Sequence, residues 1–516
     1  MKIKKLLLPL ISCISLSGCS IVNDLLDNIF SPGGGASGGQ NSTSNNVTFK
    51  DYLDVVELET LDSIGEQNIL VIPVDFTGDN LLMKKPGGYN TNRDYAKVSS
   101  RSVDHIRKAF FGESSETGWE SVSSYYYKSS YGKLKITGEV TDTYYINCSV
   151  YDLISGNKGG DRNDPTYYVL ENAVEWVRNN TNIDLKNYDK NSDGLIDSVF
   201  LIYNVDYTDT NLISVDKNNL FWAYSYWDID TTASLSNPVP CVYGWASRSF
   251  MDDGGYTLPD AHTYIHEVGH LLGLDDYYSY DEDDYGAIGG LDMMDANIGD
   301  QNAYSKSLLG WTNPTHIKEA GTYTLKPFES SGDCFIIKPN WGGSFLDEYL
   351  IIEYYTPTGL NYLDSKTAYT NRDLLFSKRG IKVLHVDARL AKLAWNTNTD
   401  VTHFKGFTAS LLNSYNSTTG IYSYSDIAAN NTASRSYSEY KLITIIDAGV
   451  PLESLNRVRS GSFADNSFLY YYDQGFGYNG NHTTFKFNSG IKPDFGFKID
   501  SLTDTGATIT FFENNN

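Results

Sequence analysis

The spacing of apolar residues divides the chain into two differently built regions. Residues 68–76 form a short, nearly continuous apolar run, which predicts a buried strand. Residues 102–111 and 165–179 repeat apolar side chains every three or four positions, which predicts helices with one buried face. The first region is therefore expected to combine strands with helices.

The pattern changes beyond Asn313 and Pro314, which mark a boundary. Short apolar runs then alternate with turns of Gly, Asn and Ser, as is typical of an all-β domain of the sandwich kind. These runs are residues 323–325, 349–355, 381–386 and 508–512. We therefore predict an α+β protein, with a first domain over residues 49–313 and a β-rich, sandwich-like C-terminal domain over residues 314–516.

The first 19 residues have a basic start and an apolar run that is too short for a transmembrane helix. This arrangement predicts an export signal. Its last four residues, LSGC, resemble the lipobox of bacterial lipoproteins, which implies cleavage before Cys19 and acylation of that cysteine. A plain secretory signal is the alternative. Residues 20–48, rich in Gly, Ser and Asn, are expected to be a flexible tether.

No other stretch of the sequence contains the roughly 18 consecutive apolar residues that a membrane-spanning helix needs. The mature chain is therefore expected to be attached to a membrane through the lipid on Cys19 alone. That places it at a bacterial cell surface, or in the medium if Cys19 is not acylated.

Charge and cysteine content narrow the class of protein further. The formal net charge is -24, which disfavours nucleic acid as a partner and supplies carboxylates for hard cations such as Ca²⁺. Cys148, Cys241 and Cys334 lie beyond the export signal. Three widely spaced thiols do not make a disulfide framework, so buried free thiols are favoured over a single bridge.

The most informative stretch covers residues 266–276 and reads HEVGHLLGLDD. On a helix, His266 and His270 stand one turn apart on the same face, so that two imidazole nitrogens can reach one Zn²⁺. Glu267 would then point at a water molecule on that metal. This combination predicts a hydrolytic zinc site with Glu267 as the general base.

The residues after His270 complete the predicted site. Gly273 lets the chain leave the helix abruptly, and Asp276 can turn back as a third, oxygen ligand. Three protein ligands leave the fourth position open for water, as in catalytic zinc sites. The helix is expected to begin near Pro259 and Asp260. His262 lies one turn before the motif and is interpreted as a supporting or surface group.

A second candidate metal site precedes it in the chain. Residues 189–197 place oxygen donors at relative positions 1, 3, 5 and 9, with Gly194 at position 6 for the turn, as in the first part of an EF-hand calcium loop. Position 12 is Phe200 and a strand is expected next, so the loop does not belong to a helix-loop-helix sensor. A solvated Asp/Asn-rich turn is the alternative to Ca²⁺ binding. The candidate ligands are Asp189, Asn191, Asp193, the backbone carbonyl of Leu195, and Asp197.

Two further groups of polar residues are not expected to form a catalytic or metal site. The acidic run over residues 275–284 is expected to be a solvated loop, with a second cation site as the alternative. His385 and Asp387 lie on a predicted strand and are expected to face hydrogen-bond partners.

Taken with three other segments, the zinc motif resembles the immune inhibitor A family of secreted bacterial metallopeptidases. The segments are residues 119–140, the GGLDMMD run at 289–295 and the NAYSKSLLGW run at 302–311. The resemblance implies a metzincin-like catalytic domain, a calcium loop preceding a strand, and a methionine turn beneath the zinc. Met294 matches the methionine of that turn better than Met293 does.

The sequence therefore predicts a lipid-anchored zinc endopeptidase that hydrolyses extracellular proteins or peptides. The alternative is a non-catalytic surface binding lipoprotein, in which the β-rich domain holds a glycan or a protein and the zinc helix is vestigial. Degenerate enzymes usually lack the general base or a metal ligand. Here the general base Glu267 and the three predicted ligands, His266, His270 and Asp276, are all present, so the sequence favours the enzyme.

Overall fold

The computed structural model describes two compact units. The first comprises the described residues up to Leu274 together with Tyr369, and the second comprises the others from Asp275 onward. Cys19, the export signal and the tether lie outside the described residues. The described ranges are 60–77, 100–154, 164–207, 220–227, 231–255, 257–279, 286–345, 347–369, 372–388, 391–396, 414–416, 421–426, 430, 441–448 and 463–514.

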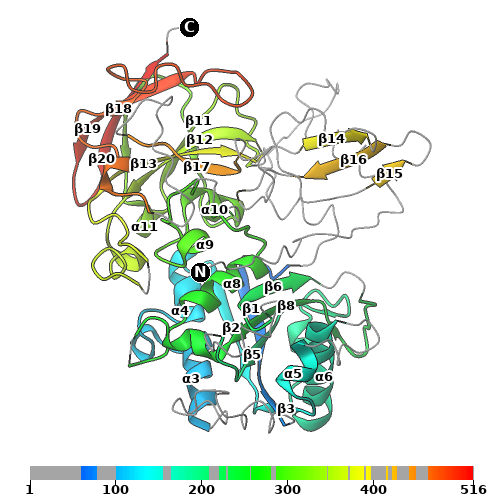
Figure 1. Ribbon diagram of the computed structural model, residues 1–516. Helices are drawn as coiled ribbons and strands as arrows, with labels where there is room; N and C mark the ends of the chain where they lie inside the picture. The colour runs from blue at the N-terminus through cyan, green and yellow to red at the C-terminus, as the bar shows by residue number, and fades with distance from the viewer. Residues whose placement is uncertain are drawn as a thin grey trace. The chain divides into compact units, whose positions relative to one another are not determined.

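The first unit is built on a mixed sheet in the strand order β2-β1-β5-β8-β6, with β3 also paired to β1 (Figure 1). The pairings are parallel except that of β6 with β8, which is antiparallel. The strands are β1 (Gly65–Phe76), β2 (Leu134–Val140), β3 (Tyr144–Ile146), β5 (Val199–Tyr203), β6 (Tyr224–Trp227) and β8 (Val242–Ser247), with β4 (Leu195–Ile196) and β7 (Val239–Pro240) forming a separate parallel pair.

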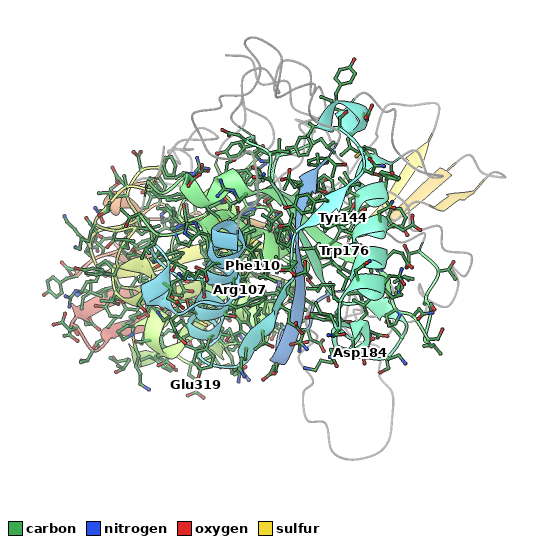
Figure 2. All side chains as sticks on the ribbon, turned by 90° about the horizontal axis from the view of Figure 1, so that it is seen from below. Arg107, Phe110, Tyr144, Trp176, Asp184 and Glu319 are labelled. Atoms are coloured by element: carbon green, nitrogen blue, oxygen red, sulfur yellow. The ribbon has the colours of Figure 1, made fainter. Side chains whose placement is uncertain are left out.

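Helices cover both faces of this sheet, so β5 and β8 are buried throughout and β1 is buried from Ile69 to its end. Figure 2 shows Phe110 on one side of β1 and Trp176 on the other. The helices are α3 (Ser100–Phe111), α4 (Val122–Ser129), α5 (Val150–Ile154), α6 (Pro165–Asn180) and α8 (His262–Leu271), and the 3₁₀ turns are η1 (Ser114–Glu116), η3 (Leu185–Tyr188) and η4 (Arg248–Asp252). The predicted strand and both predicted helices are confirmed as β1, α3 and α6.

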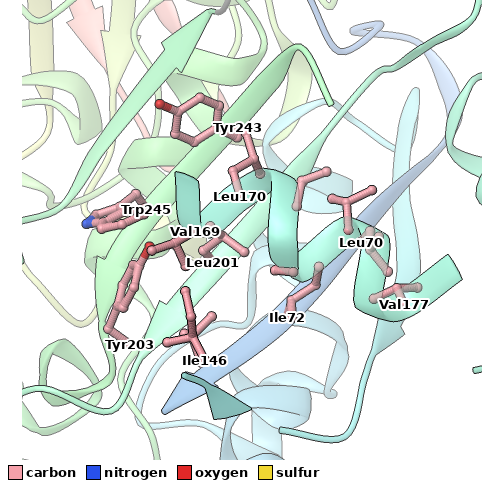
Figure 3. Packing of buried hydrophobic residues seen from close by; sticks show 14 of the residues in the cluster. Leu70, Ile72, Ile146, Val169, Leu170, Val177, Leu201, Tyr203, Tyr243 and Trp245 are labelled. Carbon is pink, nitrogen blue, oxygen red and sulfur yellow. The ribbon is translucent and has the colours of Figure 1, made fainter. Parts of the chain in front are cut away.

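The α6 face of the sheet carries a large hydrophobic core among the described residues. Asp164 caps α6 by accepting the backbone N–H groups of Thr166 and Tyr167, and Pro165 occupies the first turn, where its missing N–H costs nothing. Figure 3 shows side chains of the helix packed against those of the strands. The labelled residues of this core include Leu70, Ile72, Val169, Leu170, Val177, Leu201, Tyr203 and Trp245.

The second unit contains two larger sheets, β17-β13-β12-β11-β9 and β10-β20-β19-β18, and a smaller one, β14-β16-β15. The strands are β9 (Thr315–His316), β10 (Gly321–Leu325), β11 (Cys334–Ile337), β12 (Glu348–Tyr355), β13 (Gly380–Asp387), β14 (Ala391–Asn396), β15 (Ser414–Asn416), β16 (Ile421–Asp426), β17 (Ile443–Ile445), β18 (Gly475–Phe476), β19 (Phe495–Leu502) and β20 (Ala507–Glu513). Its helical segments are α9 (Met293–Ala296), α10 (Ala303–Leu308), α11 (Phe328–Ser331), η5 (Gly359–Asn361) and η8 (Asn466–Phe468).

One hydrophobic cluster takes side chains from both larger sheets, among them Ile352 and Val383 from the first and Phe497 and Ile509 from the second. The four strands predicted beyond residue 314 are confirmed as parts of β10, β12, β13 and β20. The chain thus combines several sheets with a few helices, which is consistent with the α+β class in general terms.

Two simpler predictions can also be compared with the structure. Cys148, Cys241 and Cys334 are buried free thiols, as expected, and burial raises the pKa of Cys334. Among the described helices, none is long and apolar enough to cross a membrane.

Candidate metal centre

The helix that carries the zinc motif, α8, begins at His262, two residues after the expected Asp260. A carboxylate oxygen of Asp260 accepts the backbone N–H of His262 at 3.0 Å and lies 2.7 Å from Nδ1 of the same residue. All ten residues of α8 are buried. The helix is therefore shielded from solvent along its whole length, and a side chain fixes its start.

The structure brings the three predicted zinc ligands together. One ligand atom from each of His266, His270 and Asp276 lies within 4.8 Å of the others, and all three residues are buried. The two imidazole rings are nearly perpendicular, with centroids 4.8 Å apart. Two imidazole nitrogens and a carboxylate oxygen are a donor set that suits Zn²⁺. In the described part of the chain, this is the one group of three such side chains with convergent ligand atoms.

A backbone contact selects the nitrogen that His270 can offer to a metal. Its Nδ1 lies 2.8 Å from the carbonyl oxygen of Leu274, and a carbonyl can only accept, so Nδ1 carries the proton. Nε2 then keeps its lone pair. Hydrogen bonds of this kind orient metal-binding histidines in proteins.

Gly273 ends the helix as predicted. Its φ of 94° lies in the left-handed region that favours glycine, and its N–H donates to the carbonyl of His270 at 2.7 Å. The N–H of Leu274 reaches back to Gly269 at 3.0 Å. These bonds satisfy carbonyls at the helix end while the chain turns toward Asp276.

Glu267, the predicted general base, is buried and contacts a strand residue that the sequence did not identify. The hydroxyl of Ser225, on β6, lies 2.9 Å from the carbonyl oxygen of Glu267 and 3.3 Å from its carboxylate Oε2. Ser225 precedes Glu267 by 42 residues. No local pattern in the sequence could have paired them.

Hydrogen bonds from two tyrosine hydroxyls join α8 to neighbouring segments of the chain. The hydroxyl of Tyr126, on α4, donates to the carbonyl of Ile265 at 2.6 Å, and that of Tyr264 donates to the carbonyl of Ser247 at 2.8 Å. Burial raises the pKa of Tyr264 well above its usual value, so its hydroxyl stays a donor at any ordinary pH. The helix is thus held by hydrogen bonds at the two residues that directly precede His266.

His262 does not belong to the convergent ligand cluster and is buried. The expectation that it could be a surface group is therefore wrong. Its ring is stacked between the indole of Trp119 and the ring of Tyr369, with centroid distances of 4.3 Å and 4.1 Å. Two aromatic residues from distant parts of the sequence thus cover the imidazole faces that water would contact if His262 lay at the surface.

Met293 and Met294 are both buried in the short helix α9. Met294 donates its N–H to a carboxylate oxygen of Asp292 at 2.8 Å, and its carbonyl accepts the N–H of Tyr277 at 2.8 Å. A backbone hydrogen bond therefore joins Met294 to Tyr277, the residue that follows Asp276. Its position relative to a bound metal stays a prediction.

Asp292 was not identified from the sequence, although an aspartate before a short helix is a capping signal. Its second oxygen accepts the backbone and side-chain N–H groups of Asn302 at 2.9 and 2.8 Å. Burial raises the pKa of Asp292 to about 7, and the N–H of Met294 and the charge of Lys382 oppose that rise. This carboxyl group joins α9 to the start of α10.

The candidate calcium loop has the predicted turn. Gly194 has a φ of 92°, and a Cβ there would lie 2.7 Å from the backbone of Ser234. The carboxylate of Asp189 accepts the N–H groups of Asp193 and Gly194, each at 3.0 Å, and Asp193 accepts that of Leu195 at 2.7 Å. These bonds are those of an Asx-rich turn.

Negative charge is nevertheless concentrated in this loop. Burial raises the pKa of Asp197 to about 6, the N–H of Lys190 lowers it, and the carboxylates of Asp193, Asp189 and Asp62 raise it further. Asp62 is an addition that the motif did not include. The loop's carboxylates are not among the convergent ligand clusters of the described residues, so calcium binding by these residues and Asn191 stays a prediction.

The remaining polar candidates have ordinary partners. His385 lies 3.0 Å from a carboxylate oxygen of Glu348, and Asn488 donates to Asp387 at 2.9 Å. The interpretation of both as hydrogen-bonded strand residues is confirmed. Half of the acidic run, residues 280–284, lies outside the described residues.

Comparison of the chain with models of protein families and with curated proteins finds no match. The function must therefore be inferred from the chemistry and geometry of the chain's own residues.

Proposed function

We propose that this protein is a zinc-dependent endopeptidase of the immune inhibitor A type, with a metzincin-like catalytic domain and a sandwich-like β-rich domain. The observation that carries the proposal is the buried convergence of His266, His270 and Asp276, with Glu267 on the same helix. A structural zinc site would need a fourth protein ligand. This donor set instead suits a catalytic site.

Each residue has a separate task in the proposed reaction. His266, His270 and Asp276 hold the metal, and Nδ1 of His270 is fixed by Leu274. Bound Zn²⁺ would supply Lewis acidity, polarising the scissile carbonyl and lowering the pKa of a coordinated water to about 7. Glu267 accepts a proton from the attacking water and delivers it to the leaving nitrogen. One water is consumed and one peptide bond is broken.

The strand β6 supports a peptide as the substrate. It is antiparallel and ends the sheet among the described strands, and Ser225 brings it beside Glu267. An extended peptide can pair with the backbone of an edge strand irrespective of most of its side chains. Such pairing suits an enzyme that cleaves within extracellular proteins.

Two parts of the proposal, the lipid anchor and the calcium site, are supported by sequence motifs alone. Lipid anchoring through Cys19 would hold the enzyme at the bacterial surface, and Ca²⁺ bound by the loop of Asp189 and Asp193 would stabilise the catalytic domain. Neither changes the chemistry proposed for Glu267.

The test is to measure zinc stoichiometry and casein cleavage on the full chain and two variants. Glu267→Gln keeps the side-chain volume but cannot accept a proton at neutral pH, so zinc should remain and the rate should fall by about 10²- to 10⁴-fold. His270→Ala should lose both zinc and activity. A wild-type protein with one zinc per chain and no cleavage would instead favour the surface binding lipoprotein.

A further inference from the structure

Ser225 lies beside a point of the sheet where no side chain beyond that of glycine fits. In the register of the sheet it lies opposite Gly244 on β8, and Gly244 lies beside Phe200 on β5. A Cβ on Gly244 would come within 2.4 Å of the Phe200 ring. Paired residues of neighbouring strands point to the same face, so Ser225, Gly244 and Phe200 share one face of the sheet.

That face is the one against which the zinc helix packs. The ring of Phe200 makes an edge contact with Tyr264 of α8, with centroids 6.0 Å apart. Phe200 fills the space above Gly244, and beyond it the hydroxyl of Ser225 meets Glu267. Ser225 is 4% exposed, so water is largely excluded from this contact.

We propose that Ser225 is a positioning residue for Glu267, an inference that rests on the proposed peptidase function. Its Oγ lies within hydrogen-bond distance of both the backbone carbonyl (2.9 Å) and the carboxylate Oε2 (3.3 Å) of that one residue. A glutamate side chain has several rotatable bonds, and a helix alone does not fix the direction of its carboxylate. The strand hydroxyl supplies that direction.

A serine is chemically suited to this task. A hydroxyl is both a donor and an acceptor, whereas a backbone N–H only donates. It can donate to a carboxylate, and it can accept from a carboxylic acid while donating to the neighbouring carbonyl. The same contact therefore persists when Glu267 takes up a proton and when it gives the proton away.

The geometry also separates this role from substrate binding. The side chain of Ser225 points at α8, while the hydrogen-bonding groups of the β6 backbone lie in the plane of the sheet. Removing the hydroxyl therefore leaves the strand edge unchanged. The reaction step should suffer, and the binding of an extended peptide should not.

The test compares zinc-loaded full chains of wild type, Ser225→Ala, Ser225→Thr and Ser130→Ala in steady-state cleavage of a peptide substrate. Ser130 is a matched control because its hydroxyl is also buried and accepts a backbone N–H, that of Leu134, at 2.9 Å. Ser225→Ala should lower kcat by about 10- to 100-fold with KM within about twofold and zinc content unchanged. Ser225→Thr should recover most of kcat, and Ser130→Ala should retain it.

The possible failures can be told apart. An unchanged kcat in Ser225→Ala, with an active wild type, would overturn the role of Ser225 and leave the peptidase intact. Loss of zinc or of the thermal transition in Ser225→Ala would show a structural role and would also overturn it. A zinc-loaded wild type that cleaves nothing would refute the proposed function itself, and this inference with it.

Discussion

The ring of Tyr369 lies nearly parallel to the imidazole of His262, with centroids 4.1 Å apart and an angle of 23° between the planes. The two residues are 107 positions apart, and Tyr369 nevertheless belongs to the same compact unit as the zinc helix. Trp119 stacks on the same imidazole at 4.3 Å. A residue from beyond the predicted domain boundary thus helps to fix the first turn of α8.

The first prediction concerns this stack. Tyr369→Leu removes the ring and part of the volume at a buried position, so it should destabilise the unit by about 1–3 kcal/mol. Tyr369→Phe keeps the ring and should cost clearly less. Thermal unfolding of the two variants measures the difference, and equal melting temperatures would show that the stack contributes nothing.

The zinc motif could be predicted because its geometry is local. The motif's first three residues, His266, Glu267 and His270, lie within two turns of one helix. Gly273 and Asp276 follow within six residues of His270. Helical spacing alone determines how the first three side chains are arranged. Nothing about the order of strands in the sheet was needed.

The contacts around the motif could not be predicted for the opposite reason. Ser225 contacts Glu267 only because β6 pairs antiparallel with β8. Tyr369 stacks on His262 although the two residues are far apart in the sequence. A single sequence carries no signal for either pairing. Four strands of the β-rich region were predictable one by one from their alternation with turns, but the arrangement of the strands into three sheets was not.

The second prediction is a pH dependence that arises from Asp292. Burial raises its pKa in the folded protein to about 7, far above the value of roughly 4 for an unfolded chain. The folded state then holds a proton that the unfolded state has lost. The stability contributed by this group is therefore complete below pH 4 and is lost as pH rises toward 7, by on the order of 4 kcal/mol at most.

Asp292→Asn removes the titration. Its amide keeps an acceptor for Met294 but turns donors toward Asn302, so the variant should be less stable than wild type at every pH. Urea unfolding at a series of pH values gives the difference between the two proteins. That difference should be largest near pH 4 and shrink toward pH 7, and a constant difference would contradict the raised pKa.

The third prediction tests the lipid anchor. Cys19→Ser should abolish acylation, and the chain should then be released or remain an uncleaved precursor. Cys13→Ser is the matched control, because that cysteine lies within the predicted leader and should leave processing unaltered. Membrane fractionation and the mass of the N-terminal peptide report the outcome. A wild type that carries no lipid would mean a plain secretory signal.

The fourth prediction concerns the loop over residues 189–197. The carboxylates of Asp189 and Asp193 in this loop, and that of Asp62 outside it, lie close enough to Asp197 to raise its pKa. A bound cation would relieve the repulsion among them. Ca²⁺ that binds only the folded state stabilises it by mass action, by about 2.7 kcal/mol at a concentration 100-fold above Kd. Thermal unfolding of the wild type with and without Ca²⁺ should therefore show a clear rise in Tm.

Asp193→Ala should remove most of that rise, because the residue supplies one of the predicted ligands and caps the N–H of Leu195. Its Tm without Ca²⁺ should also fall, since the lost cap leaves a backbone donor with a poorer partner. Asp142→Ala is a control of the same charge change at an exposed site outside the loop, and its response to Ca²⁺ should equal that of wild type. If Asp193→Ala responds to Ca²⁺ as strongly as Asp142→Ala does, the loop is a turn that binds no calcium.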